Sequence, residues 1–239
     1  MEKINLYNNT IDLDYMRTLV KFGERFPDRQ SDIWDSVSAN QFVSKKELLT
    51  TILESGILTE KLTVIVIGSW YGSIIVPVIA PLVKKVVLFD IDEQTTHMAS
   101  NLHDYDNCVY STVDVTKYKS GEFDTDNLLI INTSCEHMQS MCDVLALQKC
   151  PWNHKRTHFA FQSNNMYGIE GHVNCKDTID DFKKELPLRH LILKQQGITE
   201  ERGTRYFLFG MLPPNQSMRS NGSRQLNLRQ RTEQGVKRK

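Results

Sequence analysis

The sequence predicts an α/β three-layer sandwich around a mostly parallel, seven-stranded sheet. Three continuously apolar runs, at 63–67, 85–89 and 127–131, are typical of strands whose two faces are both covered by helices. The first two are separated by 73–83, which has the length of a helix, and a second such connector follows at 93–103. Strands that alternate with helices favour right-handed parallel crossovers within one sheet.

Four further segments complete the predicted sheet. They are 107–111, 157–162, 189–194 and 204–210. The last two lie close in sequence, on either side of a polar turn at 195–203. We therefore expect these two strands to pair with each other as an antiparallel hairpin.

A helical extension over residues 1–60 is predicted to precede the sheet. Apolar residues between positions 11 and 22 recur at spacings of three and four, and Pro27 interrupts that pattern. A second helix is expected to begin at Ser44, because Ser44 and Glu47 have the spacing of a capping box.

The α/β domain is assigned to 61–212, and a basic, disordered tail to 213–239. The tail consists mainly of Ser, Asn, Gln, Arg and Gly, which bury too little apolar surface to fold. Residues 215–239 include seven basic residues and one acidic residue, a net charge of +6, so the rest of this neutral chain carries −6. An acidic body disfavours a broad phosphate-binding face. We therefore expect only weak, nonspecific nucleic-acid contact, made by the tail.

The composition indicates a cytoplasmic protein with no membrane partner. Apolar residues make up 40% of the chain and charged residues 24%, which is ordinary for a globular protein. The five cysteines form no CxxC pair, so reduced thiols are expected. We find no signal peptide at the start, and no apolar stretch approaches the roughly 20 residues that span a bilayer.

A glycine turn follows the first predicted strand, and an acid ends the second. The first run breaks at Gly68-Ser69-Trp70-Tyr71-Gly72, and the second ends at Asp90. In an open parallel sheet such glycines allow close backbone approach to a ligand, and a carboxylate at this place accepts hydrogen bonds from ribose hydroxyls. The pair predicts a nucleoside site at the carboxyl ends of these strands.

A further acid, Asp114, follows the third predicted strand. With the glycine turn and Asp90, it resembles the cofactor motifs of the class I S-adenosylmethionine-dependent methyltransferases, a family with a Rossmann-like sheet that ends in an antiparallel hairpin. The resemblance covers roughly residues 44–211. More narrowly, the glycine turn and the segment 132–138 resemble methyltransferase-like proteins of tailed bacteriophages, which would place the protein in the host cytoplasm.

The resemblance implies that S-adenosylmethionine is the cofactor. Gly68 and Gly72 would lie against its methionine part, and Asp90 would take its ribose hydroxyls. Asp114 would meet the adenine amino group, and Val115 would stack on the ring or bond it through its backbone N–H. The residues predicted to bind the cofactor are Gly68, Ser69, Trp70, Tyr71, Gly72, Asp90, Asp114, Val115 and Lys45.

Two features of this set leave alternatives open. The family has an acid before the first glycine and a third glycine in the turn, whereas Ile67 and Trp70-Tyr71 occupy those places here. The bulky pair either closes over the cofactor or indicates another ligand. NAD is the weaker alternative, because Trp70 would occupy the place of its pyrophosphate.

Lys45 suits the cofactor's carboxylate. The alternative is that Lys45 lies on a solvated helix surface.

Polar residues directly follow the apolar strand at 127–131, where ligands bind in open parallel folds. Methyl transfer needs a positioned acceptor and, for many acceptors, removal of a proton. Asn132 is predicted to orient the acceptor, and Glu136 or His137 to take its proton. Alternatively, Asn132 caps the next helix and Glu136 supports its first turn. Cys135 is more typical of a packed thiol than of a nucleophile.

A second polar segment, 162–175, follows the fifth predicted strand and either rims the same pocket or forms a surface loop. His172 and Cys175 in this segment, with Cys135 and His137, have the side chains of zinc ligands. Their spacing matches no zinc motif, so no metal site is predicted.

The predicted function is methyl transfer to an unidentified acceptor, with a small molecule or a protein side chain favoured over duplex DNA. Two alternatives stay open. One is a catalytically silent nucleoside- or cofactor-binding protein of the same fold, which the altered glycine motif favours. The other is an enzyme that degrades S-adenosylmethionine without an acceptor.

Overall fold

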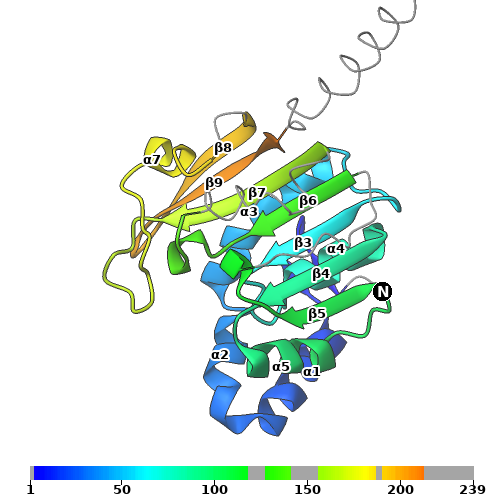
Figure 1. The fold of residues 1–239 in the computed structure, drawn as a ribbon. Helices are drawn as coiled ribbons and strands as arrows, with labels where there is room; N and C mark the ends of the chain where they lie inside the picture. The colour runs from blue at the N-terminus through cyan, green and yellow to red at the C-terminus, as the bar shows by residue number, and fades with distance from the viewer. Residues whose placement is uncertain (1–2, 118–126, 141–155, 187–189, 213–239) are drawn as a thin grey trace, which may run out of the picture.

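A seven-stranded sheet forms the centre of the molecule (Figure 1). A computed structural model describes residues 3–117, 127–140, 156–186 and 190–212, and the predicted tail at 213–239 lies outside these ranges. The strands are β3 (Thr63–Ile67), β4 (Lys85–Asp90), β5 (Cys108–Thr112), β6 (Asn127–Asn132), β7 (Arg156–Asn164), β8 (Leu191–Glu200) and β9 (Gly203–Leu212).

The strand order is β5-β4-β3-β6-β7-β9-β8. β3 pairs in parallel with β4 and β6, and the pairs β4–β5 and β6–β7 are also parallel. β9 is antiparallel to both β7 and β8. The prediction of a mostly parallel sheet that ends in a hairpin is confirmed. The order reverses between β3 and β6, and ligands bind at the carboxyl ends of strands at such a switch point.

The hairpin is longer than the sequence predicted. β8 continues through Glu200, which pairs with Gly203, so only two residues connect the strands. The predicted polar turn at 195–203 is wrong for most of its length. β8 is last in the strand order, and its side chains alternate between exposed and half-buried, so a strand at this place tolerates the polar residues that suggested a turn.

Helices cover both faces of the sheet, as the sandwich prediction requires. They are α1 (Leu13–Arg25), α2 (Gln30–Asp35), α3 (Ala39–Glu54), α4 (Ile75–Ile79), α5 (Glu93–Leu102) and α7 (Ile179–Lys183). Short 3₁₀ turns are η1 (Pro27–Arg29), η2 (Ala80–Leu82), η3 (Val115–Lys117) and η4 (Cys135–His137), and β1 (Ile4–Asn5) pairs with β2 (Thr10–Ile11).

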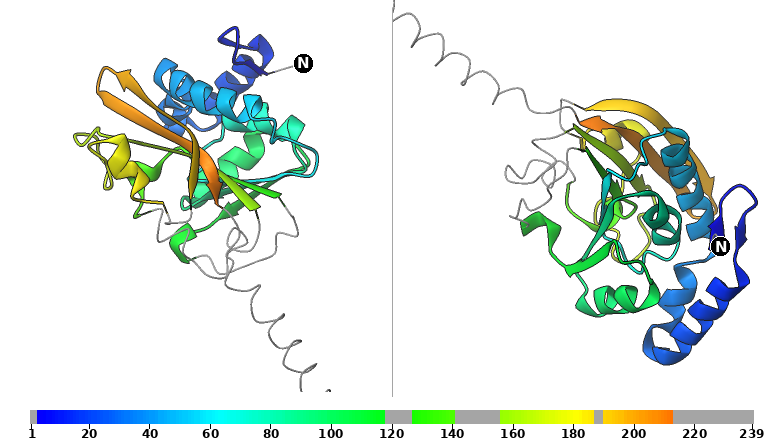
Figure 2. Two further views of the ribbon diagram at one scale, coloured as in Figure 1. Left: turned by 90° about the horizontal axis from the view of Figure 1, so that it is seen from above. Right: turned by 90° about the vertical axis from the view of Figure 1, so that its right-hand side faces the viewer.

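The N-terminal helices share one core with the sheet. Figure 2 shows these helices, in blue, gathered on one side. Leu19 of α1, Ile33 of α2 and Leu49 of α3 pack in the same buried cluster as Val64 of β3. On the opposite face, Phe182 of α7 packs in a second cluster. None of the described helices is both long and apolar enough to cross a bilayer.

Helix α3 begins six residues earlier than expected. Its N-cap is Ser38, whose hydroxyl accepts the N–H of Gln41 at 3.4 Å. The capping box predicted at Ser44 is therefore wrong: Ser44 lies inside the helix and is buried. Its hydroxyl donates to Oε1 of Gln162 on β7 at 3.2 Å, and Nε2 of Gln162 donates back to the Ser44 carbonyl at 2.8 Å. This pair fixes α3 against β7.

Candidate functional site

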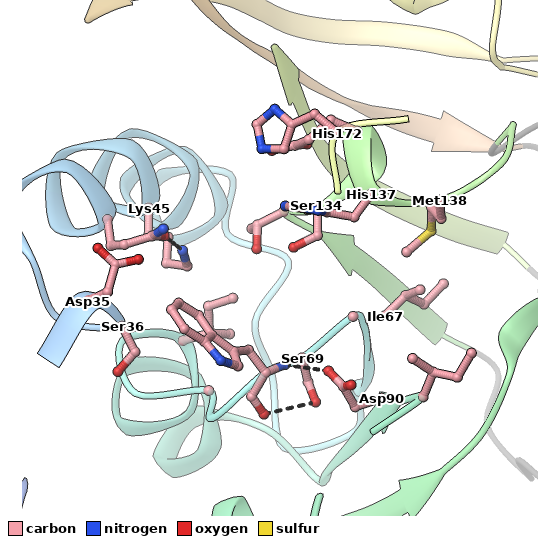
Figure 3. Close-up of a pocket in the computed structure, with 18 of the residues that line it drawn as sticks. Asp35, Ser36, Lys45, Ile67, Ser69, Asp90, Ser134, His137, Met138 and His172 are labelled. Atoms are coloured by element: carbon pink, nitrogen blue, oxygen red, sulfur yellow. Dashed lines mark hydrogen bonds between the residues drawn. The ribbon is translucent and has the colours of Figure 1, made fainter. Parts of the chain in front are cut away.

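A cavity of about 590 Å³ opens at the carboxyl ends of the parallel strands (Figure 3). Its wall includes Gly68 after β3 and Ser134 after β6, so it lies at the switch point of the sheet. Further lining residues come from α2, α3, the loop after β7 and the β8–β9 hairpin. The volume falls within the range of small-molecule sites in proteins.

The glycine turn after β3 adopts a backbone conformation that suits glycine. Gly68 and Gly72 have φ of 59° and 64°, in the left-handed region. Gly72 donates its N–H to the Ser69 carbonyl at 2.9 Å, which closes a tight turn. A Cβ on Gly72 would lie 2.6 Å from the side chain of Val76 on α4. The glycine thus lets the turn pack directly on the following helix.

Asp90, at the end of β4, anchors this turn. Its Oδ2 accepts the N–H of Trp70 at 2.7 Å, drawn dashed in Figure 3, and its Oδ1 accepts the N–H of Asp92 at 3.1 Å. Trp70 has φ of 49°, which costs a bulky residue on the order of 1–3 kcal/mol, and the bond to Asp90 holds it there. A carboxylate has about four lone-pair sites, so Asp90 can also accept from a ligand.

Asp114 and Val115 follow β5 and line the same cavity. The ammonium of Lys117, 2.7 Å from Oδ2 of Asp114, lowers the pKa of that carboxyl, and the Thr116 hydroxyl lowers it further. Both oxygens of Asp114 therefore have partners within the loop. Val115 is buried and gives the cavity an apolar wall.

Lys45 and Asp35 bring opposite charges to the wall that α2 and α3 form (Figure 3). Lys45 donates to Oε1 of Gln41 one turn earlier. Burial lowers the pKa of Lys45 to about 8; the positive charge of Arg205 adds to this effect, and the acids Glu136 and Asp35 oppose it. Lys45 was predicted to bind the cofactor, whereas Asp35 carried no signal in the sequence.

Glu136 is a buried acid on η4. Only 2% of its surface is exposed. Its Oε1 accepts Nδ2 of Asn164 at 2.6 Å and Nη1 of Arg205 at 3.3 Å, and Nε of Arg205 also donates to Oε1 of Glu200 at 3.2 Å. Its Oε2 is buried and has no hydrogen-bond partner among the described residues. One carboxylate oxygen is thus held in place, and the other is left to accept a proton or a ligand.

Two histidines lie beside Glu136. The rings of His137 and His172 meet edge to face with their centres 4.6 Å apart. Nδ1 of His137 lies 3.1 Å from the Gly171 carbonyl, and Nδ1 of His172 lies 3.0 Å from the Met166 carbonyl. Because a carbonyl only accepts, Nδ1 carries the proton in each neutral ring and Nε2 is an acceptor. Burial lowers the pKa of His172, which favours its neutral form.

Two of the predicted site residues are not among the described residues that line the cavity. Tyr71 is fully buried in the core, and its carbonyl lies 2.8 Å from Nε2 of His103. Asn132 is also fully buried, and its Oδ1 accepts the N–H of Ser134 at 2.8 Å. Asn132 therefore shapes the turn after β6, but it does not cap η4, whose N-cap is Ser134. Neither side chain is part of the cavity wall.

Cys135 has the properties of a packed thiol. It is 2% exposed, and burial together with the charge of Glu136 raises its pKa well above the usual value. A thiol that stays protonated is a poor nucleophile and a poor metal ligand.

Arg205, Glu200 and Arg202 also line the cavity, and sequence reasoning missed them. They come from the end of the β8–β9 hairpin: Glu200 and Arg202 lay in the predicted turn, and Arg205 lay in the predicted strand at 204–210. A signal was present, because Arg205 directly precedes the apolar run from Tyr206 to Phe209. An arginine that begins a buried strand needs an acidic partner, and Glu136 and Glu200 supply it.

Comparisons with known proteins agree with this architecture. No family model and no curated protein matches the sequence. Among solved structures, the chain is similar to the N-methyltransferase NodS from Bradyrhizobium japonicum WM9 in complex with S-adenosyl-l-homocysteine, with a TM-score of 0.59, 11% identity, and 84% of this chain and 100% of that chain covered. It is also similar to magnesium protoporphyrin IX methyltransferase from Synechocystis PCC 6803, with a TM-score of 0.54, 14% identity, and the same coverage.

The chain therefore has the fold of the class I S-adenosylmethionine-dependent methyltransferases. The resemblance stated from the glycine turn and the acids is confirmed at the level of the fold. The narrower resemblance to bacteriophage proteins stays a prediction.

Proposed function

We propose that this protein is an S-adenosylmethionine-dependent methyltransferase. The observation that carries the proposal is that one cavity joins the glycine turn after β3, Asp90 after β4, and Asp114 with Val115 after β5. The similar structures of the same fold were determined with S-adenosylhomocysteine bound. The sequence order of these groups and their common cavity support the same cofactor here.

The residues that line the cavity fit this cofactor. Asp90 retains lone pairs for ribose hydroxyls, and Val115 offers apolar surface to the adenine ring. Lys45 suits the carboxylate of the amino-acid end. Asp35 suits the ammonium group at the same end of the cofactor. The family has an acid directly before the first glycine, where this chain has Ile67, and Asp35 would take the place of that acid.

The chemistry of the reaction divides between the cofactor and the chain. S-adenosylmethionine supplies a methyl group on a positively charged sulfur, and transfer to an acceptor releases S-adenosylhomocysteine. The chain positions the acceptor and takes the proton that the acceptor loses. Oε2 of Glu136 and Nε2 of His137 or His172 are among the groups in the cavity wall that can accept this proton.

The acceptor we propose is a small molecule or a protein side chain. The groups that would contact it lie inside a cavity, and a base in duplex DNA would have to leave its stack to reach them. We further propose that the protein acts in the cytoplasm, where the described cysteines, all free thiols, would stay reduced.

Product analysis separates this proposal from its two alternatives. The purified protein is incubated with S-adenosylmethionine, alone and with small-molecule or protein fractions of a cell extract, and the nucleosides are identified by mass spectrometry. We expect S-adenosylhomocysteine only when a fraction is present. Cleavage products without any fraction would indicate a degrading enzyme, and binding without any product would indicate a silent protein.

A further inference from the structure

We propose that Glu136, His137 and His172 form a binding site for a divalent transition-metal ion in the wall of the cavity. A carboxylate oxygen and one ring nitrogen from each histidine all lie within 4.8 Å of one another. Glu136 and His137 come from η4 after β6, and His172 comes from the loop after β7. The switch point of the sheet thus brings together ligands that are distant in sequence.

The two histidines are held as metal ligands usually are. Each Nδ1 contacts a backbone carbonyl, of Gly171 for His137 and of Met166 for His172. Such a bond fixes the tautomer and the ring orientation, and it leaves Nε2 as the donor atom for a metal.

Glu136 supplies the second, independent observation. It is 98% buried, and its Oε2 has no hydrogen-bond partner among the described residues. A buried oxygen without a partner is costly, and a bound cation would remove that cost. Asn164 and Arg205 hold only Oε1, so they orient the carboxylate without blocking Oε2. Arg205 also pairs with Glu200, so it offsets the charge of Glu136 only in part.

The donor set indicates which ions would bind. Two imidazole nitrogens and one carboxylate oxygen favour ions such as Zn²⁺, Co²⁺ or Fe²⁺ over Mg²⁺, which prefers oxygen ligands. Metal bonds of about 2.0–2.2 Å place neighbouring donors roughly 3–3.5 Å apart, so the three side chains would move closer together on binding the ion. This set differs from the zinc ligands considered from the sequence, because Glu136 takes the place of the cysteines.

Three protein ligands leave at least one coordination position, and the cavity gives a ligand access to it. That position would take water or an oxygen or nitrogen of a small molecule. If the proposed methyl transfer is correct, the ion would bind the acceptor and favour loss of its proton to solvent, and Glu136, His137 and His172 would then hold the ion instead of taking that proton. This last role rests on the proposed function, whereas ion binding itself does not.

The test is calorimetric titration of the full chain, without a histidine tag, with Zn²⁺, Co²⁺ and Mg²⁺, together with the visible absorbance of the Co²⁺ form. We expect one Co²⁺ per chain, with affinity at least tenfold lower in His172→Ala and Glu136→Gln. His97→Ala, which removes an exposed histidine of α5, is the matched control and should bind as the wild type does.

Three outcomes would overturn the site: no Co²⁺ or Zn²⁺ binding, tighter binding of Mg²⁺ than of Co²⁺, or equal Co²⁺ affinity in His172→Ala and His97→Ala. Melting temperatures of the variants show whether each has folded, and His137→Gln provides a second variant if one fails to fold. Titration with S-adenosylhomocysteine separates the two proposals. Co²⁺ binding without nucleoside binding would leave the metal site standing and contradict the proposed function.

Discussion

Asp90 has two roles, one structural and one in ligand binding, and the sequence alone does not distinguish them. It accepts the N–H of Trp70, and so holds a strained turn, and it retains lone pairs for a ligand. Its carboxylate thus links the backbone conformation of the glycine turn to the proposed ribose site. A substitution at Asp90 should therefore affect both the stability of the turn and the affinity for the cofactor.

Asp90→Ala should weaken S-adenosylhomocysteine binding at least tenfold, because hydrogen bonds to a charged group contribute about 1.5–3 kcal/mol each. Calorimetry measures the affinity, and the melting temperature reports the loss of the Trp70 anchor. Asp104→Ala, which changes an exposed residue after α5, is the control. Unchanged affinity in Asp90→Ala would show that the ribose does not bind here.

Lys45 gives the proposed site a pH dependence. The pKa of Lys45 is about 8, so the ammonium that would bind the cofactor's carboxylate is present below that pH and lost above it. S-adenosylhomocysteine affinity should fall as the pH rises from 7 to 9. Lys45→Met should bind more weakly at pH 7 and lose most of this slope. Equal slopes in the two proteins would assign the titration to another group.

The N-terminal elements are joined to the sheet domain through a polar contact as well as through the core. Arg29 in η1 contacts Asp92 at 3.0 Å and Thr95 at 2.8 Å, both at the start of α5, and it also pairs with Asp32 at 2.8 Å. This contact fixes the segment that leads into α2. It therefore helps to place Asp35 in the cavity wall.

Arg29→Ala should lower the free energy of unfolding by about 1–2 kcal/mol. This loss is smaller than that expected for a fully buried ion pair, because the contact is partly exposed. For a domain of this size that corresponds to a fall in melting temperature of roughly 2–8 °C. Arg17→Ala on α1 is the control, since its pair with Asp14 is highly exposed. A fall equal to that of the control would show that the contact is dispensable.

Burial decides which elements the sequence could predict. β3, β4 and β6 are covered on both faces, so they read as unbroken apolar runs. β8 is polar because it ends the sheet, and its second half, 195–200, was mistaken for a turn. The start of α3 was misplaced because the spacing of Ser44 and Glu47 also occurs inside helices. Local patterns do not show whether a serine begins a helix or lies within one.

Topology and burial also explain which residues of the candidate site could be predicted from the sequence. Gly68, Asp90 and Asp114 lie at or just after the ends of parallel strands, so the topology alone predicts that they meet. Asp35 and Arg205 reach the cavity from other elements, and only the packed structure brings them there. Strand ends also do not fix the direction of a side chain, so Tyr71 and Asn132 were expected in the site but are buried beside it.

For the molecule as a whole, the cavity is built from the sheet, the segment of α2 and α3, and the β8–β9 hairpin. The sheet supplies the glycine turn and the acids, the N-terminal helices supply Asp35 and Lys45, and the terminal hairpin supplies Arg205. Since these parts share a core with the sheet, ligand binding should stabilise the whole fold. At a ligand concentration a hundred times the dissociation constant, the expected gain is about 2.7 kcal/mol.

The decisive measurement is calorimetric titration of the full chain with S-adenosylmethionine, S-adenosylhomocysteine and NAD in parallel. We expect both adenosyl compounds to bind at one site per chain with micromolar affinity, and NAD not to bind. Failure of both adenosyl compounds to bind, or tighter binding of NAD, would leave the fold in place and contradict the proposed methyltransferase.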